Sequence, residues 1–291
     1  MKLCAQLRAQ LAKLTASSVH FDVDRKCFLD RPQGTKKRGL TKVLARMFPV
    51  PHTAATAEHR RTRVSVKRRT ERFNGAVVAK CGTCEAALRV ARAGRGKLGA
   101  RLRAERNADK AHGVLVDEQL QVYVRDGRVG LFRKFKCVDP CVGTLLEQLD
   151  AEGLALIGSQ IPIYCKQIDV ATAIDLLATD RARRERLVLI EVKASSRSGA
   201  AKDYEVEHGV MVRGAMAGLP LSYYGRHQTQ LLCMQQMLAR EHGIEVHEAR
   251  VMRLSPGCVH TYSIHPEWYA RRDRLFAAIK RAVQQRKRVK K

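Results

Sequence analysis

The stretch LVLIEVKAS, residues 187–195, constrains the fold of this chain more than any other. Four apolar residues open it, as in a strand whose two faces are both covered at its start. Side chains alternate between the faces of a strand, so Glu191 and Lys193 share one face, while Val188, Ile190 and Val192 take the other. An isolated pair of this kind is usually a surface ion pair. A functional role therefore needs support from elsewhere in the chain.

A second carboxylate lies on the segment that precedes this strand. Residues 159–180 are predicted to form two extended segments with a turn near Lys166 and Gln167. In the second segment we expect Ile174 and Leu176 on one face and Asp175 on the other. A carboxylate between apolar neighbours needs a partner. Pairing of this segment with residues 187–195 would supply one by bringing Asp175 to the acid of the next strand.

Asp175 and Glu191 together predict a metal site. Two carboxylates and a backbone carbonyl, here that of Val192, form a set of hard oxygen ligands suited to Mg²⁺, with Mn²⁺ as an alternative. Lys193 beside the metal could position water, help to deprotonate it and stabilise charge on a phosphate under attack. The pattern thus predicts a metal-dependent site that cleaves phosphodiester bonds.

The charge of the chain indicates the partner. It carries 55 lysines and arginines against 28 acidic residues, a net charge of +27, and such a charge attracts DNA. Residues 1–108 hold 26 basic and 7 acidic residues, a net of +19. We interpret them as a basic, partly helical and partly flexible arm that contacts nucleic acid. The folded domain is predicted at residues 109–291.

The second part has the pattern of an α/β domain, in which helices flank a mixed central sheet. Apolar residues recur at helical spacing in several segments, and others alternate as in strands. Predicted helices cover residues 109–124, 142–157, 226–243 and 267–288, the third ending at Gly243 and the last being basic. Two further strands are predicted at residues 244–255 and 258–265.

Taken in order, these residues resemble a known family. Asp175, Glu191 and Lys193 form the pattern D-x(15)-E-x-K. With a helix before the hairpin and a glutamine-bearing helix after the E-x-K strand, the pattern resembles the PD-(D/E)xK nuclease superfamily, in its RecB-like and lambda-exonuclease-like branch. Residues 109–255 carry the resemblance. A restriction-endonuclease-like core is the fold that it implies.

The family also carries a G-x-x-x-(H/D/E) helix before the core and a Q-x-x-x-Y helix after it. Asp117 after Gly113 matches the first motif, with Glu147 after Gly143 as a rival. Gln230 matches the glutamine of the second motif. There are two departures from the family pattern, Met234 at the tyrosine position and Gln160 where an acid often stands.

The resemblance implies a Mg²⁺-dependent deoxyribonuclease, in exonuclease mode, that acts in DNA recombination, repair or genome processing. A recombination or single-strand-binding protein is an expected partner, and the chain could form an oligomer. Asp175, Glu191 and the Val192 carbonyl are the implied metal ligands, with Asp117 as a further candidate. The implied catalytic residues are Asp175, Glu191, Lys193 and Gln230. The two departures leave open a catalytically degenerate nuclease-fold protein that binds nucleic acid for packaging or scaffolding.

Other residues near this constellation are candidates for substrate contacts. Gln230 could hold the active-site lysine or a DNA phosphate, or serve as a buried structural amide. Tyr224 could stack on bases or pack internally. The predicted substrate-binding residues are Gln160, Ser195, Tyr224, Arg226 and His227.

The cysteines do not predict a metal centre. Cys81 and Cys84 could pair with Cys137 and Cys141, but the second gap and the long separation do not fit common zinc spacings. Iron–sulfur relatives carry a late group of three cysteines, where this chain has Cys258. We therefore expect neither zinc nor an iron–sulfur cluster.

No apolar stretch approaches the ~20 residues that a membrane-spanning helix requires, so no membrane contact is expected. We expect an intracellular protein, in the nucleus or in a virus-infected cell. The basic, amphipathic opening also suits a mitochondrial transit peptide, which leaves the mitochondrion as an alternative.

Overall fold

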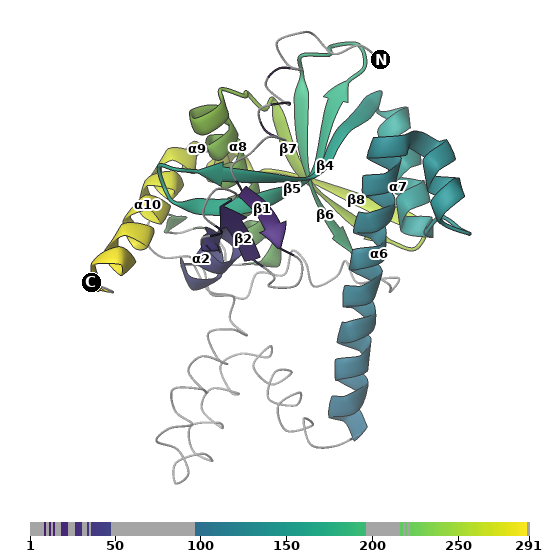
Figure 1. The fold of residues 1–291 in the computed structure, drawn as a ribbon, viewed down its shortest axis with the longest axis horizontal. Coiled ribbons are helices and arrows are strands. Elements are labelled where there is room, and N and C mark those ends of the chain that lie inside the picture. Colours follow the sequence, from purple (N-terminus) through teal and green to yellow (C-terminus); the bar gives the residue numbers. More distant parts are fainter. Residues whose placement is uncertain are drawn as a thin grey trace.

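The computed structural model describes residues 19–22, 27–30, 34, 36–47, 97–195, 216–217, 219 and 222–289, and the single residues Ala9, Ala12 and Leu14. Within these residues the chain forms a mixed sheet of eight strands with helices on both faces, an α/β architecture (Figure 1). The mixed sheet and the flanking helices are as the sequence predicts.

Three consecutive strands form the centre of the sheet. β4 (Leu154–Cys165) and β5 (Val170–Asp180) are antiparallel and joined by a tight turn, at the predicted place. β6 (Leu187–Ala194) returns antiparallel to β5. Its first six residues are buried, which explains the uninterrupted apolar start of the segment.

β5 shares one of its edges between two strands. β4 pairs with β5 from one end to the other, so it occupies one edge throughout. On the other edge β6 pairs with residues 176–179, whereas β3 (Lys36–Gly39) pairs in parallel with Val170 and Ala171. β3 and β6 therefore lie end to end. Among the described residues, none pairs on this edge with residues 172–175 of β5.

The remaining strands extend the sheet in both directions. β7 (Glu248–Ser255) runs parallel to β6, and β8 (Cys258–Ser263) is antiparallel to β7. On the other side, β1 (Val19–Asp22) and β2 (Cys27–Asp30) form an antiparallel pair, and β2 joins β3. The parallel register of β6 and β7 places Arg253 beside Lys193.

Two helices cover one face of the sheet. α6 (Lys97–Lys134) and α7 (Pro140–Ala151) pack on it, and α6 continues well beyond the sheet (Figure 1). Gly127, with φ 69° and ψ −168°, interrupts the helical geometry of α6. The core on this face joins Val116, Leu120 and Leu145 to Val188 and Ile190.

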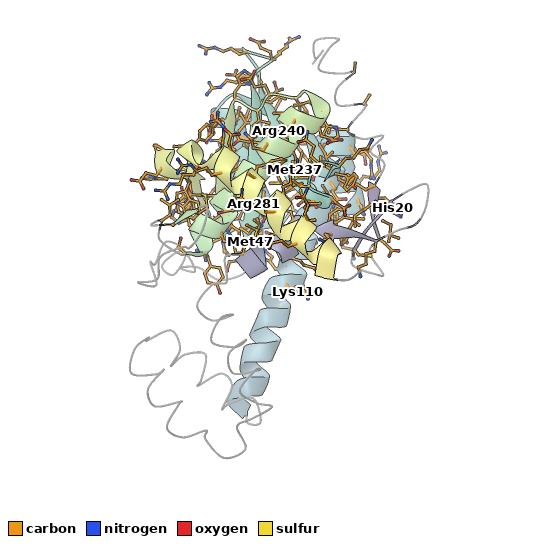
Figure 2. All side chains as sticks on the ribbon, turned by 90° about the vertical axis from the view of Figure 1, so that its left-hand side faces the viewer. His20, Met47, Lys110, Met237, Arg240 and Arg281 are labelled. Atoms are coloured by element: carbon orange, nitrogen blue, oxygen red, sulfur yellow. The ribbon has the colours of Figure 1, made fainter. Side chains whose placement is uncertain are left out.

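Among the described residues, four helices cover the opposite face, shown in Figure 2 with Met237, Arg240 and Arg281 labelled. They are α2 (Leu40–Met47), α8 (Tyr223–His242), α9 (Pro266–Ala270) and α10 (Arg272–Val289). α8 packs with Leu231 and Met234 in the core. Ser222 caps its start through the Gly225 amide, and Gly243 ends it in the left-handed conformation, as predicted.

Three predicted helices have different bounds, and the first of them, predicted at residues 109–124, lies within the longer α6. Residues 142–157 were expected to be helical, but α7 ends at Ala151 and β4 begins at Leu154. Gly153, at φ 70°, makes the turn between them, and this local geometry overrides the apolar spacing. The closing helix is divided into α9 and α10 at Arg271. None of the described helices has the length and apolarity needed to cross a bilayer.

Part of the predicted arm lies in the sheet. β1, β2, β3 and α2 all come from residues 1–108, and Leu40 and Leu44 of α2 are buried in the core beneath α8. α6 also begins before residue 109. The folded core therefore includes residues on both sides of the expected boundary at 108/109.

Candidate metal and nucleic-acid site

The two predicted carboxylates lie where β6 separates from β5. The last paired residues of these strands are Leu176 and Ile190, and Asp175 and Glu191 come directly beyond them. Asp175 Oδ2 accepts a hydrogen bond of 3.0 Å from the Val192 N–H. A side chain thus replaces the missing ladder bond between the strands, and this contact fixes the orientation of Asp175.

The Lys193 ammonium lies among the oxygens of these residues. It donates to Glu191 Oε1 and, at 3.0 Å, to the Val192 carbonyl, and lies 3.6 Å from Asp175 Oδ2. These are the three groups that the sequence predicts as metal ligands. A single cation therefore already contacts all three of them.

This arrangement fits a hard divalent cation. Two carboxylates and a carbonyl are the ligand types that Mg²⁺ and Mn²⁺ prefer. The ammonium shows that the space between Asp175, Glu191 and the Val192 carbonyl accommodates a positive charge. Lys193 keeps a 34% exposed side chain, so it has room to leave this space without passing through the core.

Gln230 holds the other oxygen of the buried acid. Its Nε2 donates a hydrogen bond of 2.9 Å to Glu191 Oε2. The residue lies in the middle of α8, which covers β6, and its side chain is buried. Lys193 and Gln230 thus bind different oxygens of one carboxylate, which is only 1% exposed.

Burial changes the proton affinities in the site. Desolvation and the neighbouring Asp175 raise the pKa of Glu191 to about 7, against the opposing effect of the Lys193 ammonium. Desolvation also raises the pKa of Asp117 to about 6, with a further contribution from Asp175. Burial alone would lower the pKa of Lys193, but Glu191 and Asp175 reverse that effect and raise it. Lys193 is therefore charged at neutral pH.

Asp117 lies within electrostatic reach of this group from α6. The rival acid, Glu147, is exposed on α7. Asp117 does not, however, form a compact ligand group with Asp175 and Glu191, since the described residues hold no such cluster around them. Asp169 accepts a bond of 2.8 Å from the Tyr164 hydroxyl beside the hairpin turn, away from the acid pair.

Positive groups lie near His227 of α8, which is itself within electrostatic reach of Lys193. Burial lowers the pKa of His227 well below its usual value, and Lys193, Arg226 and Arg253 add to the effect. Burial also lowers the pKa of Arg226. Sequence reasoning missed Arg253, because its position depends on the parallel register of β6 and β7. The one available signal for Arg253 was its place in a predicted strand, two residues after an apolar residue.

Gln160 lies on β4 opposite Asp175 and has a positive φ of 49°. The expected alternation fails at this point. Ile174 and Leu176 were predicted on one face, but Ile174 packs toward α8 and Leu176 toward α6 and α7. Leu177 returns to the face of Ile174, three residues away, so the alternation is broken around Asp175. The strand distortion lies at the candidate site.

Two predicted substrate contacts have structural partners. The Tyr224 hydroxyl donates to the Ser263 carbonyl, and its ring lies 5.3 Å from that of Tyr262, so Tyr224 joins α8 to β8. The Ser195 N–H donates to the Leu254 carbonyl at 2.9 Å. Neither contact brings these residues to the acid pair.

A separate cluster joins α6 to α7. The ligand atoms of His112, Asp139 and Cys141 all lie within 4.8 Å of one another. Asp139 caps α7 through the Cys141 amide, its other oxygen is 3.0 Å from His112 Nε2, and its own N–H donates to Gln119. These bonds account for the cluster as a helix cap. Cys141 and Cys137 are free thiols, and Cys81 and Cys84 lie outside the described residues.

Comparison with known proteins adds no family. No protein-family model matches the chain, and no curated protein matches it. Among solved structures, the chain is similar to one titled "Crystal structure of SSO0001", with 15% identity, 61% of this chain and 74% of that chain covered, and a TM-score of 0.23. Similarity at that TM-score supports no conclusion about fold or function.

Proposed function

We propose that this protein is a Mg²⁺-dependent deoxyribonuclease with a restriction-endonuclease-like core. One observation carries the proposal: the oxygens of Asp175, Glu191 and Val192 all contact a single cationic group, at the point where two core strands separate. The succession of elements supports it. A helix, an antiparallel hairpin, the strand with Glu191 and Lys193, a helix with Gln230 and a parallel strand follow one another as the sequence resemblance leads one to expect.

The alternatives to a nuclease site are weaker at these residues. A surface ion pair would leave its carboxylate in water, but Glu191 is 1% exposed. An ion pair with a purely structural role is also a weaker explanation. Burying two charges costs several kcal/mol, and a well-packed apolar pair would stabilise the fold without that cost. A second carboxylate beside the pair adds repulsion, which the raised pKa of Glu191 reflects.

Hydrolysis of a phosphodiester replaces one P–O bond by a bond to water oxygen, and the leaving oxygen gains a proton. Mg²⁺ bound by Asp175, Glu191 and the Val192 carbonyl would polarise the phosphate and increase the acidity of water. Lys193 remains an ammonium, so its charge supports donation to a phosphate oxygen better than removal of a proton. The proton of the attacking water would pass to solvent, because a pKa well below its usual value makes His227 a weak base.

Gln230 is a positioning residue in this scheme. By holding Glu191 Oε2, it leaves the other oxygen directed toward Lys193 and Asp175. Arg253 lies beside Lys193 in the sheet, and both Arg226 and Arg253 add positive charge near His227, which favours binding of a phosphate there. Met234, at the tyrosine position of the family pattern, is fully buried and packs in the core.

The degenerate, DNA-binding alternative retains the same positive surroundings without hydrolysis. Gln160 is the observation that favours it, since an amide opposite Asp175 supplies no charge for a second metal. We favour an enzyme that uses one metal. Exonuclease mode, a role in recombination, repair or genome processing, assembly into an oligomer and an intracellular site are part of the same proposal and rest on the sequence resemblance.

A cleavage assay tests the proposal. Linear duplex and covalently closed circular duplex DNA are incubated with the protein, with Mg²⁺ or with a chelator. We expect Mg²⁺-dependent loss of the linear substrate alone, and no loss with Asp175→Asn. The matched control is Asp150→Asn, an exposed carboxylate on α7 that lies outside the candidate site. Failure of the unmodified protein to cut any DNA in Mg²⁺ or Mn²⁺ would favour the non-catalytic alternative, and nicking of the circle would rule out the exonuclease mode.

A further inference from the structure

A cavity of about 640 Å³ lies beside the candidate site, between β2, β3 and the first turn of α2. Its size is within the ~300–1,000 Å³ of typical ligand pockets. Four of its lining residues are basic and one is acidic. The basic ones are Lys36, Lys37, Arg38 and Lys42, and the acid is Asp169. The cavity therefore has a strong preference for an anion.

Two of these basic side chains also make contacts within the protein. Lys37 Nζ lies 5.1 Å from the centre of the Tyr164 ring, and Arg38 Nη1 donates to the Val283 carbonyl at 3.0 Å. These contacts fix the walls of the cavity. Lys36 and Lys42 are exposed at its rim, on β3 and α2. Their ammonium groups are therefore accessible to phosphates from solvent.

Aromatic rings complete the lining. Phe21 of β1 and Phe28 of β2 meet edge to face, with ring centroids 5.1 Å apart. Phe21 is 46% exposed, which is unusual for a ring of this size and leaves a surface available for stacking. Cations at the rim and an exposed ring are the combination with which proteins bind single-stranded nucleic acid. Duplex DNA offers no unstacked base to such a ring.

The topology of β5 connects this cavity to the acid pair. β3 pairs with Val170 and Ala171, Thr172 lines the cavity, and Asp175 follows three residues later on the same strand. At ~3.3 Å per residue, Thr172 and Asp175 are about 10 Å apart along β5. Residues 172–175 form the part of this edge of β5 that, among the described residues, pairs with neither β3 nor β6. A segment of single-stranded DNA only a few nucleotides long could span the cavity and the acid pair.

We propose that this cavity binds a segment of single-stranded DNA next to the cleaved phosphodiester, with Lys36 and Lys42 on its phosphates and Phe21 stacked on a base. This inference rests on the proposed function for the position of the cleavage site. The binding itself does not depend on hydrolysis. The substrate class of the site would then be a DNA end that is single-stranded over a few nucleotides.

The test measures binding of a fluorescent single-stranded oligonucleotide by anisotropy, with chelator present so that nothing is cut. Lys36→Ala combined with Lys42→Ala should weaken binding and reduce the slope of log affinity against log salt by about 0.7 for each phosphate that is no longer neutralised. Arg183→Ala combined with Arg184→Ala, on the exposed turn between β5 and β6, removes the same charge and should leave the slope closer to that of the unmodified protein.

The aromatic contact has its own test. Phe21→Ala should weaken binding of the oligonucleotide about 5-fold or more, the range for removal of one stacking partner, and Phe21→Tyr should restore it. Binding of blunt duplex should change less. Equal losses from the Arg183/Arg184 control, or unchanged binding by both cavity variants, would overturn the proposal. Inorganic phosphate and a mononucleotide serve as competitors. If the cavity binds the mononucleotide but not the oligonucleotide, its ligand is a free nucleotide and the proposal of single-stranded DNA is wrong.

The two proposals fail separately. If the cavity variants lose oligonucleotide binding while the unmodified protein cuts no DNA in Mg²⁺, the single-stranded DNA site is supported and the nuclease activity is refuted. If DNA is cut, and the cavity variants bind and cut it as the unmodified protein does, the nuclease activity is supported and the single-stranded DNA site is refuted.

Discussion

Replacement of Lys193 by methionine tests whether the acid pair depends on a cation. Methionine keeps the length of the side chain and removes its charge, so the Glu191 carboxylate loses its ammonium partner and keeps only Gln230. The Val192 carbonyl loses a hydrogen bond as well. The ladder between β5 and β6 is unaffected, because it ends at Ile190.

The magnitude follows from the contacts. At 3.6 Å and an effective dielectric constant of about 20, the attraction between Lys193 and Asp175 alone is about 4–5 kcal/mol. Solvent reaches a third of the Lys193 side chain and reduces this value. Breaking a buried pair usually costs about 3–5 kcal/mol. We therefore expect the free energy of unfolding to fall by about 2–4 kcal/mol at about pH 8, where Glu191 is mostly ionised.

Two conditions should reduce this loss. At about pH 6, below the pKa of about 7, Glu191 takes up a proton and no longer needs a cation, so the loss should shrink. Millimolar Mg²⁺ should restore stability to Lys193→Met more than to the unmodified protein, in which the metal must displace an ammonium. Urea unfolding of both proteins at both pH values, with and without Mg²⁺, measures the free energy of unfolding under each condition.

The matched control is Arg186→Met. Arg186 pairs with Glu248 at 3.3 Å, but both side chains are a third or more exposed, so this change should cost less than about 1 kcal/mol. If Lys193→Met is no more destabilising than Arg186→Met, and Mg²⁺ restores nothing, then the acid pair does not require a cation. The reasoning about its metal site would then be refuted.

Three further outcomes are expected. Gln230→Ala should destabilise the protein by about 1–3 kcal/mol in urea unfolding, because a buried oxygen of Glu191 loses its donor; equality with Gln236→Ala, on the same helix, would contradict this. By calorimetry, Mg²⁺ affinity should rise with pH through about 7, because Glu191 must lose its proton to bind the metal. In metal-free protein the sign is opposite: the folded state holds the protons of Asp117 and Glu191 more tightly than the unfolded state. The unfolding free energy therefore falls as pH rises from their ordinary pKa values, about 4, to the raised values of about 6 and 7. Leu44→Ala should cost about 2–5 kcal/mol in a single unfolding transition, since α2 belongs to the common core; a separate transition would contradict that.

The hairpin, the strand with Glu191 and the helix with Gln230 were predictable because each has a regular pattern. Alternation or an uninterrupted apolar run indicated β4, β5 and β6, and Gly243 indicated the end of α8. These local signals also placed Glu191 and Lys193 on one face. Convergence of Asp175 with them required only that consecutive antiparallel strands be neighbours, which is the usual case.

The features that were not predicted depend on long-range pairing. β3 joins β5 more than 100 residues later in the sequence, and the basic composition of residues 36–39 gave no sign of a strand. Arg253 meets Lys193 only through the register of two parallel strands. The distortion at Asp175, where Ile174 and Leu176 turn to opposite faces, breaks the alternation on which the prediction relied. Local sequence carries none of this information.

The most direct test of the central claim is Glu191→Gln, measured by Mg²⁺ calorimetry and by single-turnover cleavage of linear DNA. The amide keeps the shape of Glu191 but is a poor ligand for a hard cation, so we expect loss of both Mg²⁺ binding and cleavage, with DNA binding retained. The control is Glu147→Gln, an exposed acid on α7, which should change none of the three. Cleavage by Glu191→Gln at the unmodified rate would show that Glu191 and Lys193 form an ordinary ion pair, and the nuclease site would be refuted.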